Sequence, residues 1–205
     1  MTIKDVARKA GVAVSTVSYA LNGSPKVSEK TRKRIQKVAK DIRYEPNYLA
    51  RELKTKKTNT IGLFLSVFSS PFYSELVRGI QEVAQKHDYS FIVCSSFGGE
   101  ESTAVKYLRE KRIDAAIIFD RYISNDLLIN TASNGVPIVV LDRKLESENI
   151  YSILINNEQG ARKAVSYLIE TGHKNLVFVS GNEDAYDNKE RLNVFCDTVA
   201  CNEIE

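Results

Sequence analysis

The sequence predicts a two-part protein of the α + α/β class, in which a small helical unit precedes a doubly wound parallel sheet. Two observations carry this prediction. Residues 1–60 show short amphipathic helical patterns and hold 15 Lys/Arg against 5 Asp/Glu, a net charge of +10. Residues 61–205 alternate apolar, strand-length runs with helical patterns and hold 14 Lys/Arg against 21 Asp/Glu, a net charge of −7. A basic unit joined to an acidic body indicates a polyanion-binding module attached to a domain with a different task.

The overall composition fits a folded protein of a reducing compartment. The chain has 205 residues, of which 43% are hydrophobic, enough for one large domain or for a small and a medium one. Its three cysteines, Cys94, Cys196 and Cys201, follow no metal or disulfide spacing. The N-terminus lacks an apolar signal segment, and no apolar run reaches membrane-spanning length. We therefore expect a cytoplasmic protein with no membrane partner.

Three short helices are expected before residue 46. In the first, apolar residues recur at the spacing of one helical face: Ile3, Val6, Ala7 and Ala10. Thr2 suits its N-cap and Gly11 its C-cap. The second helix, "VSTVSYAL", follows a tight glycine-containing turn, and the third begins after Ser28. These two would complete a small shared core: Val17, Ala20, Leu21, Ile35, Val38, Ala39 and Ile42. Two short helices joined by such a turn form the helix-turn-helix pattern.

The outward face of the second helix carries small hydroxyl residues, one valine and one tyrosine: Val14, Ser15, Thr16, Ser18 and Tyr19. Hydroxyl groups can donate to or accept from base edges, and a valine can contact a thymine methyl group. The alternative is an ordinary solvated face, but such a face more often carries Lys and Glu. This helix is therefore a candidate reader of the DNA major groove.

The body alternates strands with helices. Strands are expected near residues 60–67, 89–96, 114–120 and 136–142, and helices near 74–88, 102–112 and 125–134. This order of near-continuous apolar strands and helices indicates a parallel sheet buried on both faces. A ligand would bind beyond the carboxyl ends of the strands, at residues 66–73, 95–99, 119–121 and 142–143. A second lobe begins near Asn156, where "TGHKNLVFVSG" predicts a turn and a strand, with His173 as a structural turn residue.

Three segments resemble, in this order and spacing, the start of LacI/GalR-family transcriptional regulators: "IKDVARKAGVAVSTVSYALNG", "VSEKTRKRI" and "YEPNYLARELKTKKTNTIGL". The resemblance implies four parts: a helix-turn-helix headpiece (1–46), a hinge helix and linker (47–59), the first lobe of a periplasmic-binding-protein-like effector domain (60–155) and part of its second lobe (156–205). It implies a nucleoid-associated repressor that binds a pseudo-palindromic operator as a homodimer and responds to a small molecule, most commonly a sugar. Because the family continues beyond the position of Glu205, we expect an incomplete second lobe, in a fragment or a truncated product.

The resemblance also implies roles for single residues in DNA binding. The outward residues of the second helix would read the major groove, and the DNA backbone would be contacted by Thr2, Asn22, Thr31, Tyr44 and Asn47. Ala50 and Leu53 would enter the minor groove, where an apolar wedge unstacks a base step and bends the duplex. So short a hinge helix is marginal in water, so we expect it to form on DNA; the alternative is that Leu53 packs on the sensor domain. Many family members have arginine in place of Tyr19, which leaves open the base that faces it.

The implied effector-binding residues are Phe72, Tyr73, Phe119, Asp142 and Arg191. Aromatic faces with the acid and the arginine of Asp142-Arg143 suit a sugar or another polar ring compound. The alternative for Phe72 and Tyr73 is packing at a helix N-terminus. Val194 stands where the family has a glycine.

Two other functions were weighed. An enzyme is disfavoured because no G-x-G-x-x-G or P-loop motif follows a strand and no Ser or Cys has an evident base partner. No metal or cofactor site is expected. The second is a DNA-binding regulator that has lost effector sensing through C-terminal truncation. The sequence identifies neither the effector nor whether it induces or co-represses.

Overall fold

The computed structural model describes residues 1–45, 55, 57–183 and 185–202. The expected hinge residues Asn47, Ala50 and Leu53 lie outside the described residues. The chain divides into two compact units, Met1–Lys56 and Lys57–Glu205, called the first and second unit below.

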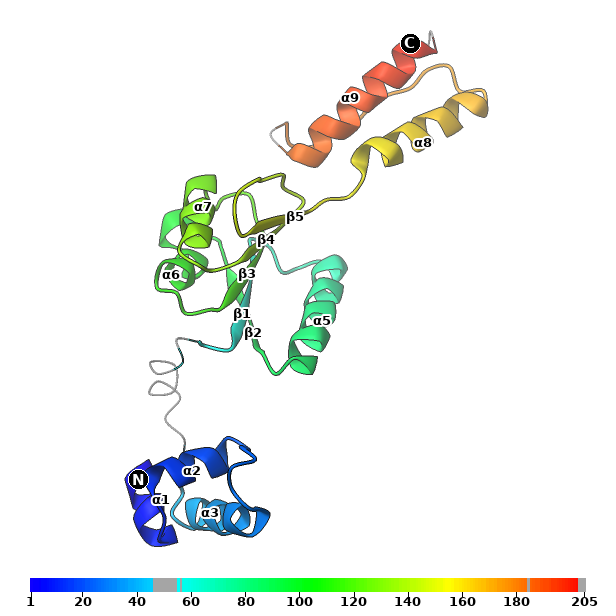
Figure 1. The fold of residues 1–205 in the computed structure, drawn as a ribbon. Coiled ribbons are helices and arrows are strands. Elements are labelled where there is room, and N and C mark those ends of the chain that lie inside the picture. Colours follow the sequence, from blue (N-terminus) through cyan, green and yellow to red (C-terminus); the bar gives the residue numbers. More distant parts are fainter. Residues whose placement is uncertain (46–54, 56, 184, 203–205) are drawn as a thin grey trace. The chain divides into compact units, whose positions relative to one another are not determined.

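The described residues of the first unit form three helices: α1 (Ile3–Ala10), α2 (Val14–Leu21) and α3 (Glu29–Asp41) (Figure 1). The backbone nitrogen and the Oγ1 of Thr2 each donate to Asp5 Oδ2 at 2.9 Å, and these bonds lower the pKa of Asp5. Gly11 ends α1 with a φ of +62°, which a glycine adopts without strain. Ser28 Oγ accepts from the Thr31 nitrogen and caps α3. The predicted helix limits are confirmed.

The three helices enclose one small apolar core. Its fully or almost fully buried residues are Val6, Ala7, Ala10, Val17, Ala20, Val27, Ile35, Ala39 and Ile42. Leu21 and Val38 pack against this cluster but are only partly buried. Tyr44 also packs on it from the chain that follows α3. The core therefore holds α2 by one side only and leaves its hydroxyl-rich side outside.

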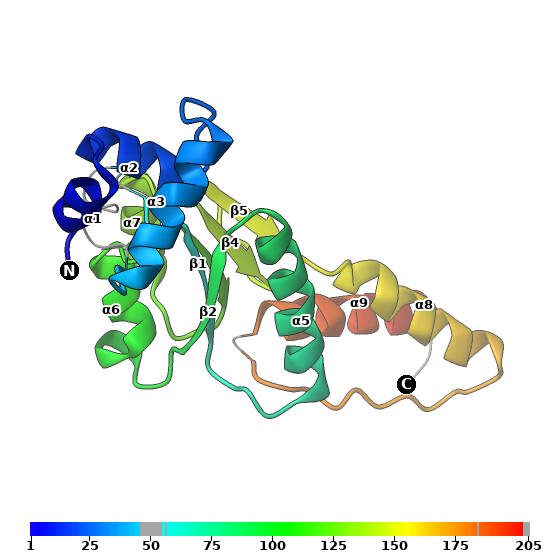
Figure 2. The same cartoon turned by 90° about the horizontal axis from the view of Figure 1, so that it is seen from below.

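The second unit is built on a five-stranded parallel sheet with the order β2-β1-β3-β4-β5. Its strands are β1 (Thr60–Leu65), β2 (Ser90–Ser95), β3 (Ala115–Phe119), β4 (Ile138–Leu141) and β5 (Ile150–Ile153). Helix α5 (Pro71–Lys86) covers one face, whereas α6 (Thr103–Arg109) and α7 (Asn125–Ser133) cover the other (Figures 1 and 2). A 3-10 turn, η1 (Gly99–Glu101), leads into α6. The predicted doubly wound sheet is confirmed, while β5 was not predicted.

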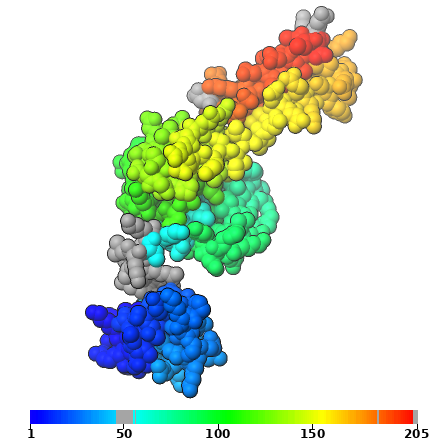
Figure 3. Space-filling view, in the orientation of Figure 1, coloured from blue at the N-terminus to red at the C-terminus, as the bar shows by residue number. Residues whose placement is uncertain are grey.

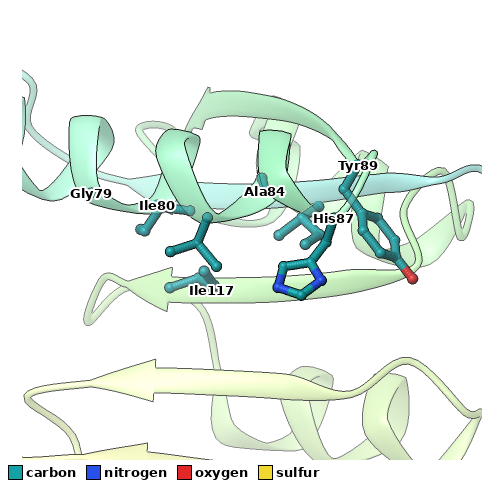
Figure 4. Close-up of a pocket in the computed structure, with 8 residues that line it drawn as sticks. Gly79, Ile80, Ala84, His87, Tyr89 and Ile117 are labelled. Carbon is teal, nitrogen blue, oxygen red and sulfur yellow. The ribbon is translucent and has the colours of Figure 1, made fainter.

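The two faces of the sheet are unequally covered. On the α6–α7 side, Phe64, Ile118, Ile138 and Val140 are fully or almost fully buried. On the α5 side, a cavity of about 390 Å³ remains between α5 and strands β1 and β3, lined by Ile80, Val83 and Ile117 among others (Figure 4). The apolar side of α5 is correspondingly half-covered, since only Ala84 among the residues of that helix is buried. Helix α5 alone does not close this face.

Two further helices, α8 (Asn157–Glu170) and α9 (Tyr186–Cys201), lie against each other (Figure 3). The strand predicted in "NLVFVSG" is wrong: the segment is not a strand, because none of the described strands pairs with it. Val177 and Val179 are 87% and 90% exposed, while Phe178 packs on Phe195 with ring centroids 5.3 Å apart. Along the described chain, every helix is too short or too polar to span a bilayer.

One carboxylate fixes the point where the chain enters the sheet. Asp114, directly before β3, accepts from the Thr58 nitrogen at 2.7 Å, from Thr58 Oγ1 at 2.9 Å and from the Asn59 nitrogen at 3.0 Å. Hydrogen bonds to a charged acceptor are stronger than neutral ones, and three of them converge here. Asp114 therefore anchors the residues that precede β1 to the adjacent strand.

Replacing Asp114 by alanine should lower the free energy of unfolding of the second unit by about 1–3 kcal/mol, because the Thr58 and Asn59 donors lose a charged acceptor. Urea denaturation followed by far-ultraviolet circular dichroism measures this change. Asp197→Ala, which removes the same charge from an exposed position on α9, is the control and should change stability by less than about 0.5 kcal/mol. Equal effects of the two substitutions would show that the anchor contributes nothing.

Candidate functional sites

The predicted major-groove residues share one surface of α2. Val14, Ser15 and Tyr19 are exposed, and Thr16 and Ser18 are half-buried at the edges of this surface. On the opposite side, Val17 and Ala20 are locked into the core of the first unit. The Asn22 side-chain amide donates to the Ser18 carbonyl at 2.8 Å and closes the last turn. The helix is thereby held rigidly with its hydroxyl groups outward, as insertion into a groove requires.

Two of the predicted backbone-contacting residues, Thr2 and Thr31, lie at helix N-termini. Thr2 precedes α1, and Thr31 sits in the first turn of α3, where its Oγ1 accepts from Ser28 Oγ at 3.0 Å. Tyr44 is half-buried against the helical core. Helix N-termini present free backbone N–H groups and a partial positive charge, both of which favour phosphate.

The second candidate site is a cleft of about 600 Å³ at the carboxyl ends of β1, β3 and β4, continued by the residues before and at the start of α9. Three residues predicted from sequence line it: Tyr73, Phe119 and Asp142. Phe72 does not line the cleft, but its ring stands edge-on to those of Tyr73 and Phe119, with both centroid distances 5.6 Å. Ser70 Oγ accepts from the Phe72 nitrogen at 3.2 Å, so this aromatic cluster lies at the N-terminus of α5.

Asp120, which lines the cleft, joins the carboxyl ends of two strands, β2 and β3. Its Oδ2 accepts from Ser96 Oγ at 2.7 Å, and its Oδ1 accepts from the nitrogens of Tyr122 and Ile123 at 2.7 and 2.8 Å. Because these four groups belong to the segments after β2 and β3, the bonds hold the rim of the cleft in one conformation. Asp120 lies within residues 119–121, where a ligand was expected, but its bonds to the protein indicate a supporting role.

Arg143 has a different role from the ligand contact expected of it. Its Nη1 donates to the Ile123 carbonyl at 2.8 Å, and its Nη2 donates to Asn125 Oδ1. Burial lowers the pKa of this guanidinium, an effect that Asp120 opposes. The side chain is thus committed to the loop between β3 and α7. Asp142 faces the cleft without help from the adjacent arginine.

Asp142 is the strained residue of the cleft. Its φ is +55°, in the left-handed region, while its nitrogen still donates to the Ile153 carbonyl at 3.0 Å. Its Oδ1 is buried and accepts no hydrogen bond from the described residues. Burial raises the pKa of this carboxyl, and the nearby Asp187 raises it further, while Arg191 lowers it. A buried acceptor that lacks a donor is a natural contact for a ligand hydroxyl or N–H group.

A buried donor is linked to the cleft through Arg191 and Asp187. Asn157, at the start of α8, is 4% exposed, and its Nδ2 is buried with no acceptor in the described structure. Its Oδ1 accepts from Arg191 Nε at 2.8 Å, and Arg191 Nη2 forms an ion pair with Asp187 Oδ2 at 3.3 Å. Arg191 therefore touches the cleft through Asp187, which lines it. Asp142 and Asn157 together present one unsatisfied acceptor and one unsatisfied donor.

Sequence reasoning missed Asp187, which lines the cleft, and Asn157, which is bonded to Arg191. Asp187 precedes Arg191 by four residues, a helical ion-pair spacing that was available in the sequence. Nothing local distinguishes Asn157 from its neighbour Asn156, whose Oδ1 caps α8 by accepting from the Gln159 nitrogen. Only the packing of α8 against α9 buries one asparagine and not the other.

Replacing Asp142 by asparagine should raise the melting temperature at pH 7. The folded-state pKa of Asp142 is raised above its ordinary value of 3.8. The protonated carboxyl therefore contributes its full stability to the fold below pH 3.8, and this stability is lost as the pH rises through the raised pKa and the carboxyl ionises. An uncharged asparagine, which also tolerates a left-handed φ, avoids this loss. Calorimetry at pH 7, 5 and 4 should show the advantage of the variant shrinking as the pH falls.

The matched control is Glu146→Gln, because the Glu146 side chain is 84% exposed. Its melting temperature should follow the wild type at all three values of pH. A D142N variant that is less stable at pH 7, or whose advantage does not change with pH, would contradict the assignment of Asp142 as a strained, desolvated carboxylate.

Comparison with known proteins places both units in one family. Residues 2–47 match "Bacterial regulatory proteins, lacI family", and residues 58–203 match "Periplasmic binding proteins and sugar binding domain of LacI family". The chain is 34% identical over 197 residues to the HTH-type transcriptional repressor PurR of Photobacterium profundum, covering 95% of this chain and 59% of that protein. It is 38% identical over 184 residues to catabolite control protein A of Priestia megaterium, covering 88% of this chain and 55% of that protein.

Among solved structures, the lac repressor dimer bound to operator and the anti-inducer ONPF is similar with a TM-score of 0.79 and 27% identity. That similarity covers 100% of this chain and 63% of the lac repressor chain. The chain thus spans somewhat more than half the length of the curated relatives it matches. The resemblance to the LacI family seen in the sequence is confirmed, and the chain belongs to this family of bacterial regulatory proteins.

Proposed function

We propose that this chain is a sequence-specific DNA-binding regulator of transcription, a repressor whose affinity for its operator is set by a small molecule in the cleft. The observation that carries the proposal is the α2 surface: five side chains suited to base edges, on a helix fixed by its other side, in a unit of strong positive charge. The PurR protein of Photobacterium profundum, to which the chain is similar, is named as an HTH-type transcriptional repressor.

Binding to DNA would use two copies of the chain. The lac repressor structure is a dimer bound to operator, which supports a homodimer on a pseudo-palindrome here. Val14, Ser15, Thr16, Ser18 and Tyr19 would read each half-site. Thr2, Asn22, Thr31, Tyr44 and Asn47 would position the first unit on the DNA backbone. Ala50 and Leu53 would enter the minor groove at the centre of the operator.

The ligand of the cleft would be a sugar or a similar polyhydroxylated ring compound. A ring hydroxyl would donate to Asp142 Oδ1, and a ring or hydroxyl oxygen would accept from Asn157 Nδ2, satisfying the two buried groups that the protein leaves unpaired. The rings of Tyr73 and Phe119 would pack on the apolar face of the ligand, with Phe72 supporting them. Arg191 would act on the ligand through Asn157 and Asp187.

The DNA proposal is tested by selecting bound sites from a random duplex library with the whole 205-residue chain. We expect an inverted repeat with one central base step. Leu53→Ala should weaken binding to that site about tenfold or more and leave non-specific DNA almost unchanged, because only a wedged and bent complex uses the leucine. Enrichment of single half-sites would contradict the homodimer, and no enrichment would contradict sequence-specific binding.

The ligand proposal is tested by thermal shift with neutral sugars, phosphorylated sugars and nucleobases. A ligand at one hundred times its Kd should stabilise the second unit by about 2.7 kcal/mol. Asn157→Ala should abolish the shift, whereas Asn193→Ala, at an exposed position on α9, should retain it. Silence across the whole panel would favour the second candidate, a regulator of the same operator without effector sensing. A shift that survives Asn157→Ala would place the ligand elsewhere.

A further inference from the structure

A lysine outside α2 contacts the one aromatic residue of that helix. Lys26 Nζ lies 5.2 Å from the centroid of the Tyr19 ring, and both side chains are exposed. In the described structure, no carboxylate forms an ion pair with Lys26. Helix α2 itself, "VSTVSYAL", contains no cationic side chain. Among the described residues, Lys26 therefore supplies the positive charge that contacts the Tyr19 ring, in the last turn of α2.

The backbone between the two residues is fixed, so their proximity does not depend on a free loop. The Ser24 nitrogen donates to the Tyr19 carbonyl at 3.0 Å, and Arg32 Nη2 donates to the Ser24 carbonyl at 2.8 Å. Val27, the residue after Lys26, is buried in the core of the first unit. The turn that carries Lys26 is thus tied to α2 on one side and to α3 on the other.

The chemistry of the pair differs from that of either residue alone. The face of a tyrosine ring attracts an ammonium group and restricts where it can go. A lysine ammonium has three donors, and a ring face is only a weak acceptor that can take one of them, so at least two donors stay free for a stronger acceptor. These donors therefore stay available at the surface of α2. In the major groove, guanine is the base that presents two acceptors, N7 and O6, to such a group.

We propose that Tyr19 and Lys26 form one base-reading unit, in which the Tyr19 ring holds the Lys26 ammonium against the major groove to donate to N7 and O6 of a guanine. Lys26 is then a specificity-determining residue that lies beyond the recognition helix. The inference rests on the proposed function, because it requires α2 to enter the major groove.

The test uses the whole chain and the operator obtained from site selection. Each guanine of a half-site is replaced in turn by 7-deazaguanine, which lacks the N7 acceptor. The wild type should lose about tenfold in affinity at one position, the range expected for one specific base contact. Lys26→Met should bind the unmodified operator about tenfold more weakly and show no further loss on the modified one. Lys37→Met, which removes an exposed charge from α3, is the matched control and should retain the full loss on the modified operator.

The role of the ring is tested in the same assay. In a Tyr19→Leu background, Lys26→Met should lower the affinity for the operator at most about threefold, because the ammonium is no longer held by a ring. In a Tyr19→Phe background the ring remains, so Lys26→Met should still lower the affinity by most of the roughly tenfold seen in the wild type. If Lys26→Met still lowered the affinity about tenfold in the Tyr19→Leu background, the proposed pairing of Tyr19 with Lys26 would be overturned.

Three further outcomes would overturn the proposal. The first is a wild-type operator with no guanine in its half-site, and the second is a Lys26→Met variant that still loses affinity on 7-deazaguanine. The third is a loss that is equal on specific and non-specific DNA, with the slope of log K against log salt reduced by about 0.9, since that is the signature of a phosphate contact. If the wild type selected no operator, the proposed function itself would be refuted. This outcome differs from the three above, in which an operator is selected and only the role of Tyr19 and Lys26 is refuted.

Discussion

The parallel alignment of β1, β3 and β4 is the constraint on which the cleft depends. Parallel strands end at the same edge of a sheet, so residues far apart in sequence, such as Tyr73, Phe119 and Asp142, line one cavity. The alignment alone would leave flexible loops at that edge. Asp120 removes this freedom by bonding to the segments after β2 and β3, and Arg143 ties the segment after β4 to the same loop. These side-chain bonds give the cleft a fixed geometry that the strand alignment alone would not provide.

The charged groups of this edge divide between support and recognition. Asp120 and Arg143 use their polar atoms on the protein itself, which stabilises the fold and leaves little capacity for a ligand. Asp142 and Asn157 do the reverse, since each keeps a buried polar atom unpaired at a cost to stability. Such unpaired groups favour a partner that brings the missing donor and acceptor together. The most conspicuous pair in the sequence, Asp142-Arg143, is thus split between the two roles.

The parts that could be predicted from sequence are those set by local periodicity. Helices α1, α2 and α3 follow from apolar spacing and from the caps Thr2, Gly11 and Ser28, and the parallel sheet follows from alternation. The wrong or missing predictions depend on distant partners. Strand β5 is only four residues long and exists because β4 pairs with it, whereas residues 176–180 have a stronger strand pattern but no described strand beside them. Likewise, no local signal shows that Asn157 is buried or that Arg143 bonds to Ile123.

Strand β3 offers a physical route by which events in the cleft could reach the residues that follow the expected hinge. Its carboxyl end carries Phe119 and Asp120 at the cleft, and Asp114, just before its amino end, binds the backbone of Thr58 and Asn59. β3 is the central strand of the sheet and is hydrogen-bonded to a neighbour on each side, so its two ends are joined by a continuous ladder of backbone hydrogen bonds. A ligand can change DNA affinity only if it binds two arrangements of the protein with different affinity. We infer that Asp114 is where such a difference would pass from the sheet to the chain entering it, because it is the one side chain in the described structure that binds both residues 58 and 59.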